Sequence, residues 1–262
     1  MAEGEAGEAF FTESGGLLVP APHARGPWSP DMLHGRLLGG LLARAIEREH
    51  SADGLHFARL TVDLYRNSPL VPLRIDTARV RDGRRIRVAD ATISGARGPI
   101  ARASAVMLRR GPHPEGEIWA APVWDVPAPD ELDPQAAPSG FHLRPILSGD
   151  AAAAGFQSAD RHRAWLRETR ALVAGESLTP FVRVVLAADM ASPMAHFGSA
   201  GLKFINADYT VHLSRLPLGD DIGIEGAGHL GDEGVAVGRC TLYDTSGPLG
   251  FCATSAIANV RG

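Results

Sequence analysis

An internal repeat constrains the fold of this chain more than any single motif. Residues 60–66 (LTVDLYR) resemble residues 209–215 (YTVHLSR), which sets Thr61 and Thr210 149 positions apart. Other residues recur at the same offset: Thr92 with Thr241, Gly98 with Gly247, and Pro99 with Pro248. Because the offset does not slip between these anchors, the sequence predicts two copies of one α+β unit. Ligand sites favour the boundaries between such units, so we expect a site where the copies meet.

Composition fits one large globular domain or two of ordinary size. The 262 residues are 45% hydrophobic, enough for a sizeable core. The formal net charge of −4 gives no reason to expect a nucleic-acid partner. The apolar runs fall far short of the roughly 20 residues that span a bilayer. Since the acidic N-terminus also lacks the regions of a signal peptide, we expect a soluble cytoplasmic protein with no membrane partner.

The two cysteines favour packing over cross-linking. Cys240 and Cys252 lie symmetrically about Ser246, so a hairpin places them opposite each other, and the first copy has Ala91 and Ala103 there. Small apolar residues at both positions indicate a tight packing layer, with a cross-strand disulfide as the alternative. Two cysteines cannot form a structural zinc site, and the ten histidines lack ligand spacing, so no metal is expected.

The first copy is predicted to contain a short strand, a helix and an antiparallel meander. The expected strands lie at 10–20 (with a turn at Gly15-Gly16), 57–66, 71–81, 85–95 and 99–109. The helix is expected from about Pro30 to His50, but Gly39 and Gly40 interrupt its apolar face. A helical glycine costs up to about 1 kcal/mol relative to alanine. We therefore expect close approach of a sheet to compensate.

The second copy follows a proline-rich segment at 111–150, which predicts a surface connection without strand or helix. A strand is expected at 163–172 and a helix at 177–190, capped by Ser177 or Thr179 with Pro180 in its first turn. The remaining expected strands lie at 204–214, 221–229, 234–244 and 249–260. Each meander is predicted to wrap around its helix, and the two sheets to pair edge to edge.

Familiar catalytic motifs are missing from the sequence. Residues 226–231 (GAGHLG) match GxGxxG, but they lie between two expected strands with no helix after them, which excludes a dinucleotide site. The sequence has no GxxxxGK[ST], HExxH or GxSxG motif. The commonest nucleotide, zinc-protease and serine-hydrolase sites are therefore not predicted.

Asp189 is the candidate general base. It ends an apolar run just before Ala191 to Pro193, and an anion at a helix C-terminus is disfavoured by roughly 0.3–1 kcal/mol at exposed sites. Its counterpart in the first copy falls near Gly39 and Gly40, so the unit does not need the charge. The carboxylate either acts as a general base with a tuned pKa or caps the following loop.

His34-Gly35 at the start of the first helix forms a second candidate site. Free amides at a helix N-terminus bind anions or a developing oxyanion, and glycine lets a ligand approach closely. The alternative is a turn glycine beside a solvent-facing histidine.

With both copies laid out, the chain resembles the acyl-CoA thioesterases of the double hotdog type, the bacterial thioesterase II group. The resemblance lies in LHGRLLGGLLARAIE (33–47), ARLTVDLYRNSPL (58–70), VRDGRRIRVADATI (80–93), KFINADYTVHLSR (203–215) and LYDTSGPLGFCATSAI (242–257). It implies a sheet wrapped around a central helix in each half, with acyl-CoA bound between the halves.

The resemblance also implies a catalytic set. The family's Asp corresponds to Asp189, its Thr falls on Asn206, and its Gln falls near Thr254 or Ser255. A helix start that is often His-Gly-Gly in relatives is His34-Gly35-Arg36 here. The implied reaction is water attack on a thioester carbonyl, with Asp189 activating the water, Asn206 and Thr254 helping, and His34, Gly35 and Ser255 contacting the substrate.

These expectations divide the chain into repeats at 1–110 and 156–262 joined by 111–155. The expected function is hydrolysis of acyl-CoA thioesters without a cofactor, with acyl-CoA as the small-molecule partner and homo-oligomers forming through the hotdog sheets. One alternative is acyl-CoA binding without turnover. Another is a hydratase or dehydratase, which Asp31 and His34 mimic in spacing only.

Overall fold

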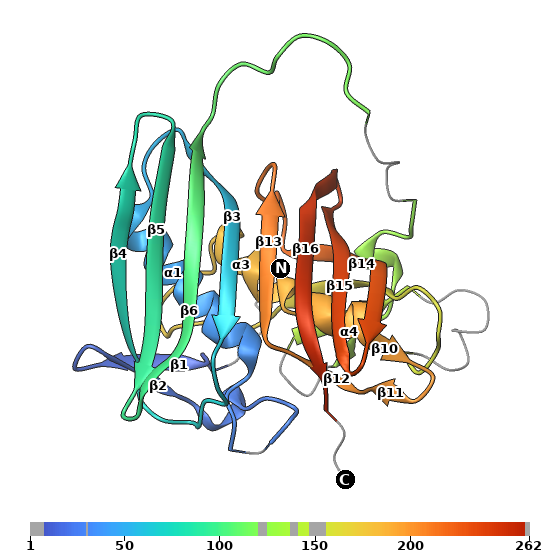
Figure 1. Cartoon of the computed structure of the whole chain (residues 1–262), viewed down its shortest axis with the longest axis horizontal. Coiled ribbons are helices and arrows are strands. Elements are labelled where there is room, and N and C mark those ends of the chain that lie inside the picture. Colours follow the sequence, from blue (N-terminus) through green and yellow to red (C-terminus); the bar gives the residue numbers. More distant parts are fainter. Residues whose placement is uncertain (1–7, 30, 120–124, 137–140, 147–155, 260–262) are drawn as a thin grey trace.

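One long antiparallel sheet carries the helices on one of its faces (Figure 1). The computed structural model describes residues 8–29, 31–119, 125–136, 141–146 and 156–259. Twelve strands form this sheet. In order they are β4 (Arg74–Asp82), β5 (Ile86–Gly95), β6 (Gly98–Arg109), β3 (Leu55–Leu64), β13 (Asp208–Leu213), β16 (Gly247–Ala258), β15 (Val235–Asp244), β14 (Asp221–Asp232), β9 (Arg163–Glu168), β8 (Phe141–Pro145) and β7 (Gln135–Ala136), with β12 (Phe204–Asn206) also pairing with β16.

Three α-helices among the described residues lie against this sheet: α1 (Gly35–His50), α3 (Pro180–Ala188) and α4 (Ala191–His196). The first, α1, packs on β3 to β6 and on α3, whereas α4 packs on β14, β15 and β16. Short elements complete the described fold: β1 (Phe11–Ser14), β2 (Leu17–Pro20), η1 (Pro22–Ala24), η2 (Pro129–Glu131), β10 (Phe197–Gly198) and β11 (Gly201–Leu202). In the part of the chain described, no helix has the length and apolar character to cross a membrane.

The predicted repeat is confirmed, but the predicted meander order is wrong: β3 pairs with β6 and not with β4, and β13 pairs with β16 and not with β14. The bounds of β5 and β15 differ by one constant offset, and those of β6 and β16 by the same offset. Where the copies meet, β3 pairs with β13, Thr61 lies opposite Thr210, and the Thr210 hydroxyl donates to the Thr61 hydroxyl at 3.1 Å. An approximate two-fold axis therefore passes between these threonines and relates the two halves of the sheet.

The helix boundaries differ from the prediction in both copies. Helix α1 begins at Gly35 rather than near residue 30, because Leu33 and Met32 are held in bridges to other segments and His34 is the cap. The second helix was expected to stop at Ala191–Pro193, but α4 starts there. Pro193 lies in the first turn of α4, where its missing N–H breaks no helical hydrogen bond.

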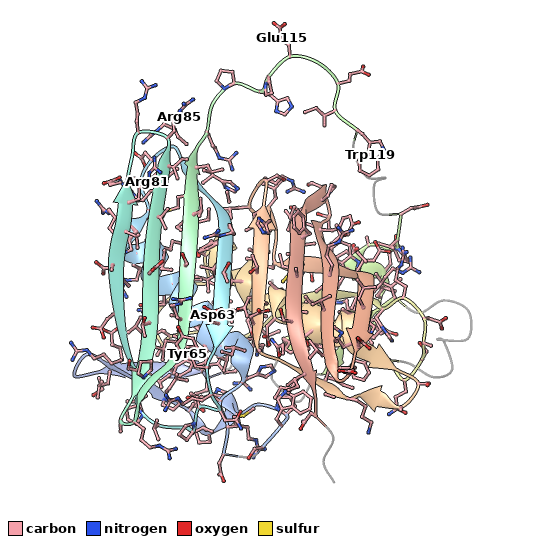
Figure 2. All side chains as sticks on the ribbon, in the orientation of Figure 1. Asp63, Tyr65, Arg81, Arg85, Glu115 and Trp119 are labelled. Atoms are coloured by element: carbon pink, nitrogen blue, oxygen red, sulfur yellow. The ribbon has the colours of Figure 1, made fainter. Side chains whose placement is uncertain are left out.

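The connection was only partly predicted. Residues 110–119 extend away from the sheet without a strand or helix, and Trp119 is exposed (Figure 2). The expectation of no strand in 111–150 was wrong, however, because β7 and β8 lie within it. Strand β8 pairs with β9 and buries Phe141, so this segment extends the sheet of the second copy.

The cysteine prediction is confirmed. Cys240 pairs directly with Cys252 across the β15–β16 hairpin, and Ala91 pairs with Ala103 in the first copy. Both thiols are free and buried, which makes the disulfide alternative wrong. Burial raises the pKa of Cys240 to about 12, so this thiol is an inert packing group.

Close packing explains the glycine pair in α1. A Cβ atom at Gly39 would lie 1.7 Å from the hydroxyl oxygen of Tyr209, on β13, which confirms the expected approach of the sheet. A Cβ atom at Gly40 would lie 2.5 Å from a Leu186 methyl group on α3, a helix contact that was not predicted. The two glycines therefore set the distance from α1 to β13 and α3 of the second copy.

We predict that Gly39→Ala destabilises the protein even though alanine favours helix. Overpacking costs about 1–3 kcal/mol, more than the roughly 1 kcal/mol gained in helix propensity. Urea unfolding measures the difference. Adding Tyr209→Phe, which removes the clashing hydroxyl, should restore part of the loss; equal losses with and without it would contradict this explanation.

Candidate active site

Asp189 lies in the break between α3 and α4, where the first copy has one continuous helix. Its side chain is buried, and burial raises the pKa of its carboxyl above the ordinary value. The side-chain amide of Asn206 donates to Asp189 Oδ1 at 3.1 Å, and this bond and the nearby charge of Arg36 act in the opposite direction. The carboxylate is therefore poorly solvated but held by a fixed donor.

The N-terminus of α1 faces this carboxylate across the junction of the copies. A Cβ atom at Gly35 would lie 3.7 and 3.8 Å from the two carboxylate oxygens of Asp189. Glycine thus allows the first turn of α1 to approach Asp189 without an intervening side chain. The structure brings together Gly35, Asp189 and Asn206, which the sequence analysis had chosen separately.

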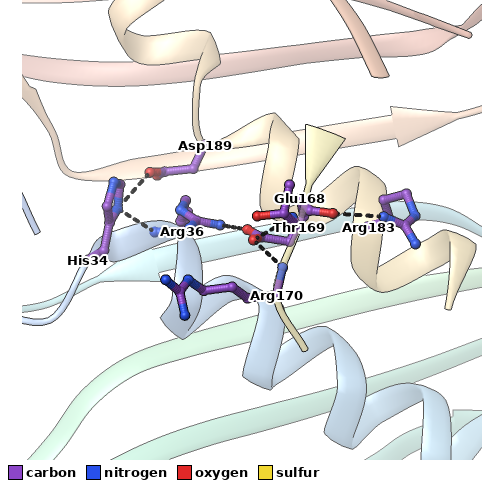
Figure 3. Close-up of polar contacts among 7 residues, drawn as sticks. All are labelled: His34, Arg36, Glu168, Thr169, Arg170, Arg183 and Asp189. Atoms are coloured by element: carbon purple, nitrogen blue, oxygen red, sulfur yellow. Dashed lines mark hydrogen bonds and ion pairs between the residues drawn. The ribbon is translucent and has the colours of Figure 1, made fainter. Parts of the chain in front are cut away.

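His34 caps α1 beside the same carboxylate (Figure 3). Its Nδ1 accepts the Arg36 backbone N–H at 3.4 Å and lies 3.9 Å from Asp189 Oδ2. Burial, with help from the Arg36 charge, lowers the pKa of His34 to about 3, so the contact with Asp189 is not an ion pair at neutral pH. Because Nδ1 accepts, the ring proton is assigned to Nε2, which is then a neutral donor.

An ion pair between Arg36 and Glu168 fastens the two copies beside the candidate site (Figure 3). Both side chains are almost wholly buried, and the Arg36 guanidinium lies 5.0 Å from the ring centres of Phe10 and Phe141. Glu168 Oε1 also accepts the backbone N–H groups of Thr169 and Arg170 at 3.0 and 3.1 Å. The carboxylate is therefore satisfied from both repeats.

Thr254 and Ser255 meet Asp208 rather than Asp189. The Thr254 hydroxyl donates to the Asp208 carbonyl at 2.8 Å, and the Ser255 backbone N–H donates to Asp208 Oδ1 at 2.7 Å. Successive side chains of a strand point to opposite faces, so the buried Thr254 and the half-buried Ser255 do not share a face of β16. Both residues fix the chain just after Asn206.

Sequence reasoning missed Glu168 and the role of Arg36. Arg36 was noted only as a departure from His-Gly-Gly, and Glu168 only as part of an expected strand. The available signal was a charge at the end of the apolar strand RAWLRE, whose partner no sequence spacing could identify. A small cavity of about 10 Å³ is lined by this pair and by Met190.

Solved structures show which fold this chain shares. The chain has the fold of an Alicyclobacillus acidocaldarius protein with a hot dog fold, at 15% identity and a TM-score of 0.74, covering 96% of each chain. A Thermobifida fusca protein provisionally described as a thioesterase II matches with 17% identity, a TM-score of 0.75, and 96% of this chain and 97% of that one. An acyl-CoA thioesterase II from Mycobacterium marinum matches with 13% identity, a TM-score of 0.64, and 87% and 91% of the two chains.

Sequence profiles identify the family. The profile of the acyl-CoA thioesterase N-terminal domain matches residues 24–108, and that of the C-terminal domain matches residues 122–257. The chain belongs to the acyl-CoA thioesterase family, and its activity is the hydrolysis of acyl-CoA thioesters. No curated protein sequence matches it significantly.

We predict that breaking the buried ion pair is costly and that removing both charges is less so. Arg36→Met leaves Glu168 buried without its cation and should lower the free energy of unfolding by about 3–5 kcal/mol. Adding Glu168→Gln should recover part of the loss in urea unfolding. The matched control is Arg102→Met, which breaks the exposed pair with Asp63 and should cost at most about 1 kcal/mol. Equal costs at the two sites would contradict the assigned role.

Proposed function

We propose that this chain hydrolyses its thioester at the junction of α1 with the α3–α4 break, with Asp189 as general base. The observation that carries the proposal is the approach of the Asp189 carboxylate to Gly35 across the two copies. A base held there can deprotonate a water molecule, while the first-turn amides of α1 stabilise the oxyanion that forms on the same carbonyl.

In the proposed reaction, Asp189 is the one group that accepts and returns a proton. The water oxygen attacks the carbonyl carbon as its proton passes to Asp189, giving a tetrahedral oxyanion next to the Gly35 amide. The intermediate collapses, the C–S bond breaks, and Asp189 returns the proton to the leaving thiolate. The products are a carboxylic acid and free CoA, and no covalent enzyme intermediate is required.

In our proposal, the other candidate residues from the sequence support these steps. Asn206 holds the Asp189 carboxylate through its amide, and neutral His34 offers Nε2–H to the substrate. Thr254 and Ser255 act as positioning residues, because they fix Asp208 and thereby the strand that carries Asn206. The amide of Asn206, which stands in place of the family's hydroxyl, supplies a donor at this position.

We further propose that the two halves of the chain form a double hotdog fold. Each half of the sheet would wrap its own helix, with repeats at 1–110 and 156–262 and the connection at 111–155. The packing of α1 on β3 to β6 and of α4 on β14 to β16 supports this division. We also propose fatty acyl chains as substrates, homo-oligomers formed through the sheets, and action in the cytoplasm, where unbridged cysteines such as this pair are the rule.

Asp189→Asn should lower kcat by about 10²–10⁴-fold, the usual contribution of a general base. Release of CoA from a panel of short, medium and long acyl-CoAs, followed with a thiol reagent, measures the loss. Thermal stability at neutral pH should stay equal or rise, because a carboxyl whose folded pKa is raised opposes folding once it is ionised.

The matched control is Asp63→Asn, a partly exposed carboxylate at the sheet junction that should leave the rate unchanged. An unchanged rate in Asp189→Asn would remove this residue from the mechanism. Tight binding without CoA release from any chain length in the wild type would favour acyl-CoA binding without turnover.

Asn206→Ala should shift the pH dependence of kcat/KM. The base works ionised, so activity falls as pH drops through the pKa of Asp189, which burial holds above 3.8. Removing the Asn206 donor takes away a contribution that lowers this pKa, and the acidic limb should move to higher pH. Activity should return at alkaline pH. A uniform loss at every pH would assign Asn206 to another role.

A further inference from the structure

A cavity of about 570 Å³ lies within the second copy, separate from the Asp189 site. It is bounded by the end of α4, the β10–β11 hairpin, residues 159–162 and the start of the GAGHLG segment on β14. Its volume falls in the range of small-molecule sites, about 300–1,000 Å³. The proposed hydrolysis does not use it.

Glycines keep this cavity open. Gly198 and Gly228 line it, and a Cβ atom at either would meet no atom within 4 Å. Neither glycine has the positive φ that favours this residue type. Neither packing nor backbone conformation therefore calls for glycine here, whereas a bound molecule would need the space.

The first copy has a smaller groove at the equivalent place, and charged side chains line it. At the repeat offset, Glu49 stands where the second copy has Gly198, and the strand register places Ala78 where it has Gly228. The groove there measures about 240 Å³, and Arg44 pairs across it with Glu13. The larger volume of the cavity is therefore a property of the second copy and not of the repeated fold.

Aromatic and imidazole rings form two clusters at the cavity. Phe156, His162 and Phe197 have ring centres 5.5 to 5.9 Å apart, and His196, Phe204 and His229 have ring centres 5.0 to 5.7 Å apart. Five of these six rings line the space. The Nδ1 atoms of His196 and His229 lie 2.8 Å apart, within hydrogen-bond distance. Such walls suit a planar ring.

The charged lining favours an anion. Lys203 is the only lysine in the chain, it is exposed at the cavity, and it has no ion-pair partner among the described residues. Arg161 also lines the cavity and pairs with Glu225 at 3.3 Å while staying largely exposed. Asp160 is the only acidic lining residue. A lysine point charge is a common phosphate ligand.

We propose that this cavity binds an adenine nucleotide, with the base between the ring clusters and the phosphates at Lys203 and Arg161. The nucleotide is either the end of the CoA substrate, which rests on the proposed hydrolysis, or a free nucleotide. The course of the chain favours CoA, because α4 begins two residues after Asp189 and Phe204 lies two residues before Asn206. The cavity and the proposed active site thus share α4 and β12.

The single lysine makes binding measurable without turnover. An amine-reactive acetylating reagent, followed by mass spectrometry, reports on Lys203, with the chain's α-amino group as internal reference. We expect CoA and adenosine 3′,5′-bisphosphate each to slow acetylation of Lys203 at least fivefold, and pantetheine to have no effect. Equal rates with and without both nucleotides would overturn the proposal. Because no hydrolysis is involved, an inactive enzyme leaves this result interpretable.

A variant that fills the cavity distinguishes CoA from a free nucleotide as the occupant. Gly228→Leu should weaken adenosine 3′,5′-bisphosphate at least tenfold in calorimetry, whereas the control Gly111→Leu, at an equally open loop position, should not. If CoA is the occupant, Gly228→Leu raises KM for acyl-CoA but not for acyl-pantetheine. If a free nucleotide is the occupant, the variant leaves both KM values unchanged. Unweakened binding in a folded Gly228→Leu protein would overturn the proposal.

Discussion

The pairing of β3 with β13 is the contact on which the rest of the structure depends. It joins two half-sheets into one and sets their register at the Thr61–Thr210 pair. That register fixes where α1 of the first copy lies relative to the α3–α4 break of the second. The contact between Gly35 and Asp189, and the ion pair between Arg36 and Glu168, both follow from it.

Burial has opposite consequences at two neighbouring carboxylates. Glu168 is compensated by a guanidinium and two backbone amides, so its burial fastens the copies together. Asp189 has one firm side-chain donor, Asn206, and its pKa rises. A buried carboxylate with few hydrogen-bond donors lowers the stability of the fold but provides a stronger base. This compromise is usual in enzyme sites.

The sequence predicted most of the features that recur in both copies, and it predicted few of those that occur in one copy only. The hairpin pairing of Cys240 with Cys252 and the packing reason for Gly39 followed from offsets and local chemistry. The strand order did not, because β3 pairs with β6 and β13 with β16, where a meander would pair them with β4 and β14. The break between α3 and α4 did not, because Pro193 signals a stop as readily as a first turn. Strand β8 was hidden by proline-rich composition, and its place depends on pairing with β9. Asp189 could be identified because the first copy has no carboxylate at the equivalent position. The role of Glu168 could not, because its partner Arg36 is distant in sequence and close only in the folded structure.

The repeat offset gives most residues of one copy a counterpart in the other, and the counterpart of Asp189 is Gly40. Gly40 sits in mid-helix with a Leu186 methyl group where any side chain would go. An assembly of two identical units would carry two equivalent catalytic places, but here the carboxylate belongs to one copy and the facing helix start to the other. In the proposed mechanism, duplication followed by such specialisation gives one turnover centre per chain, so a titration of functional sites would count whole chains and not repeats.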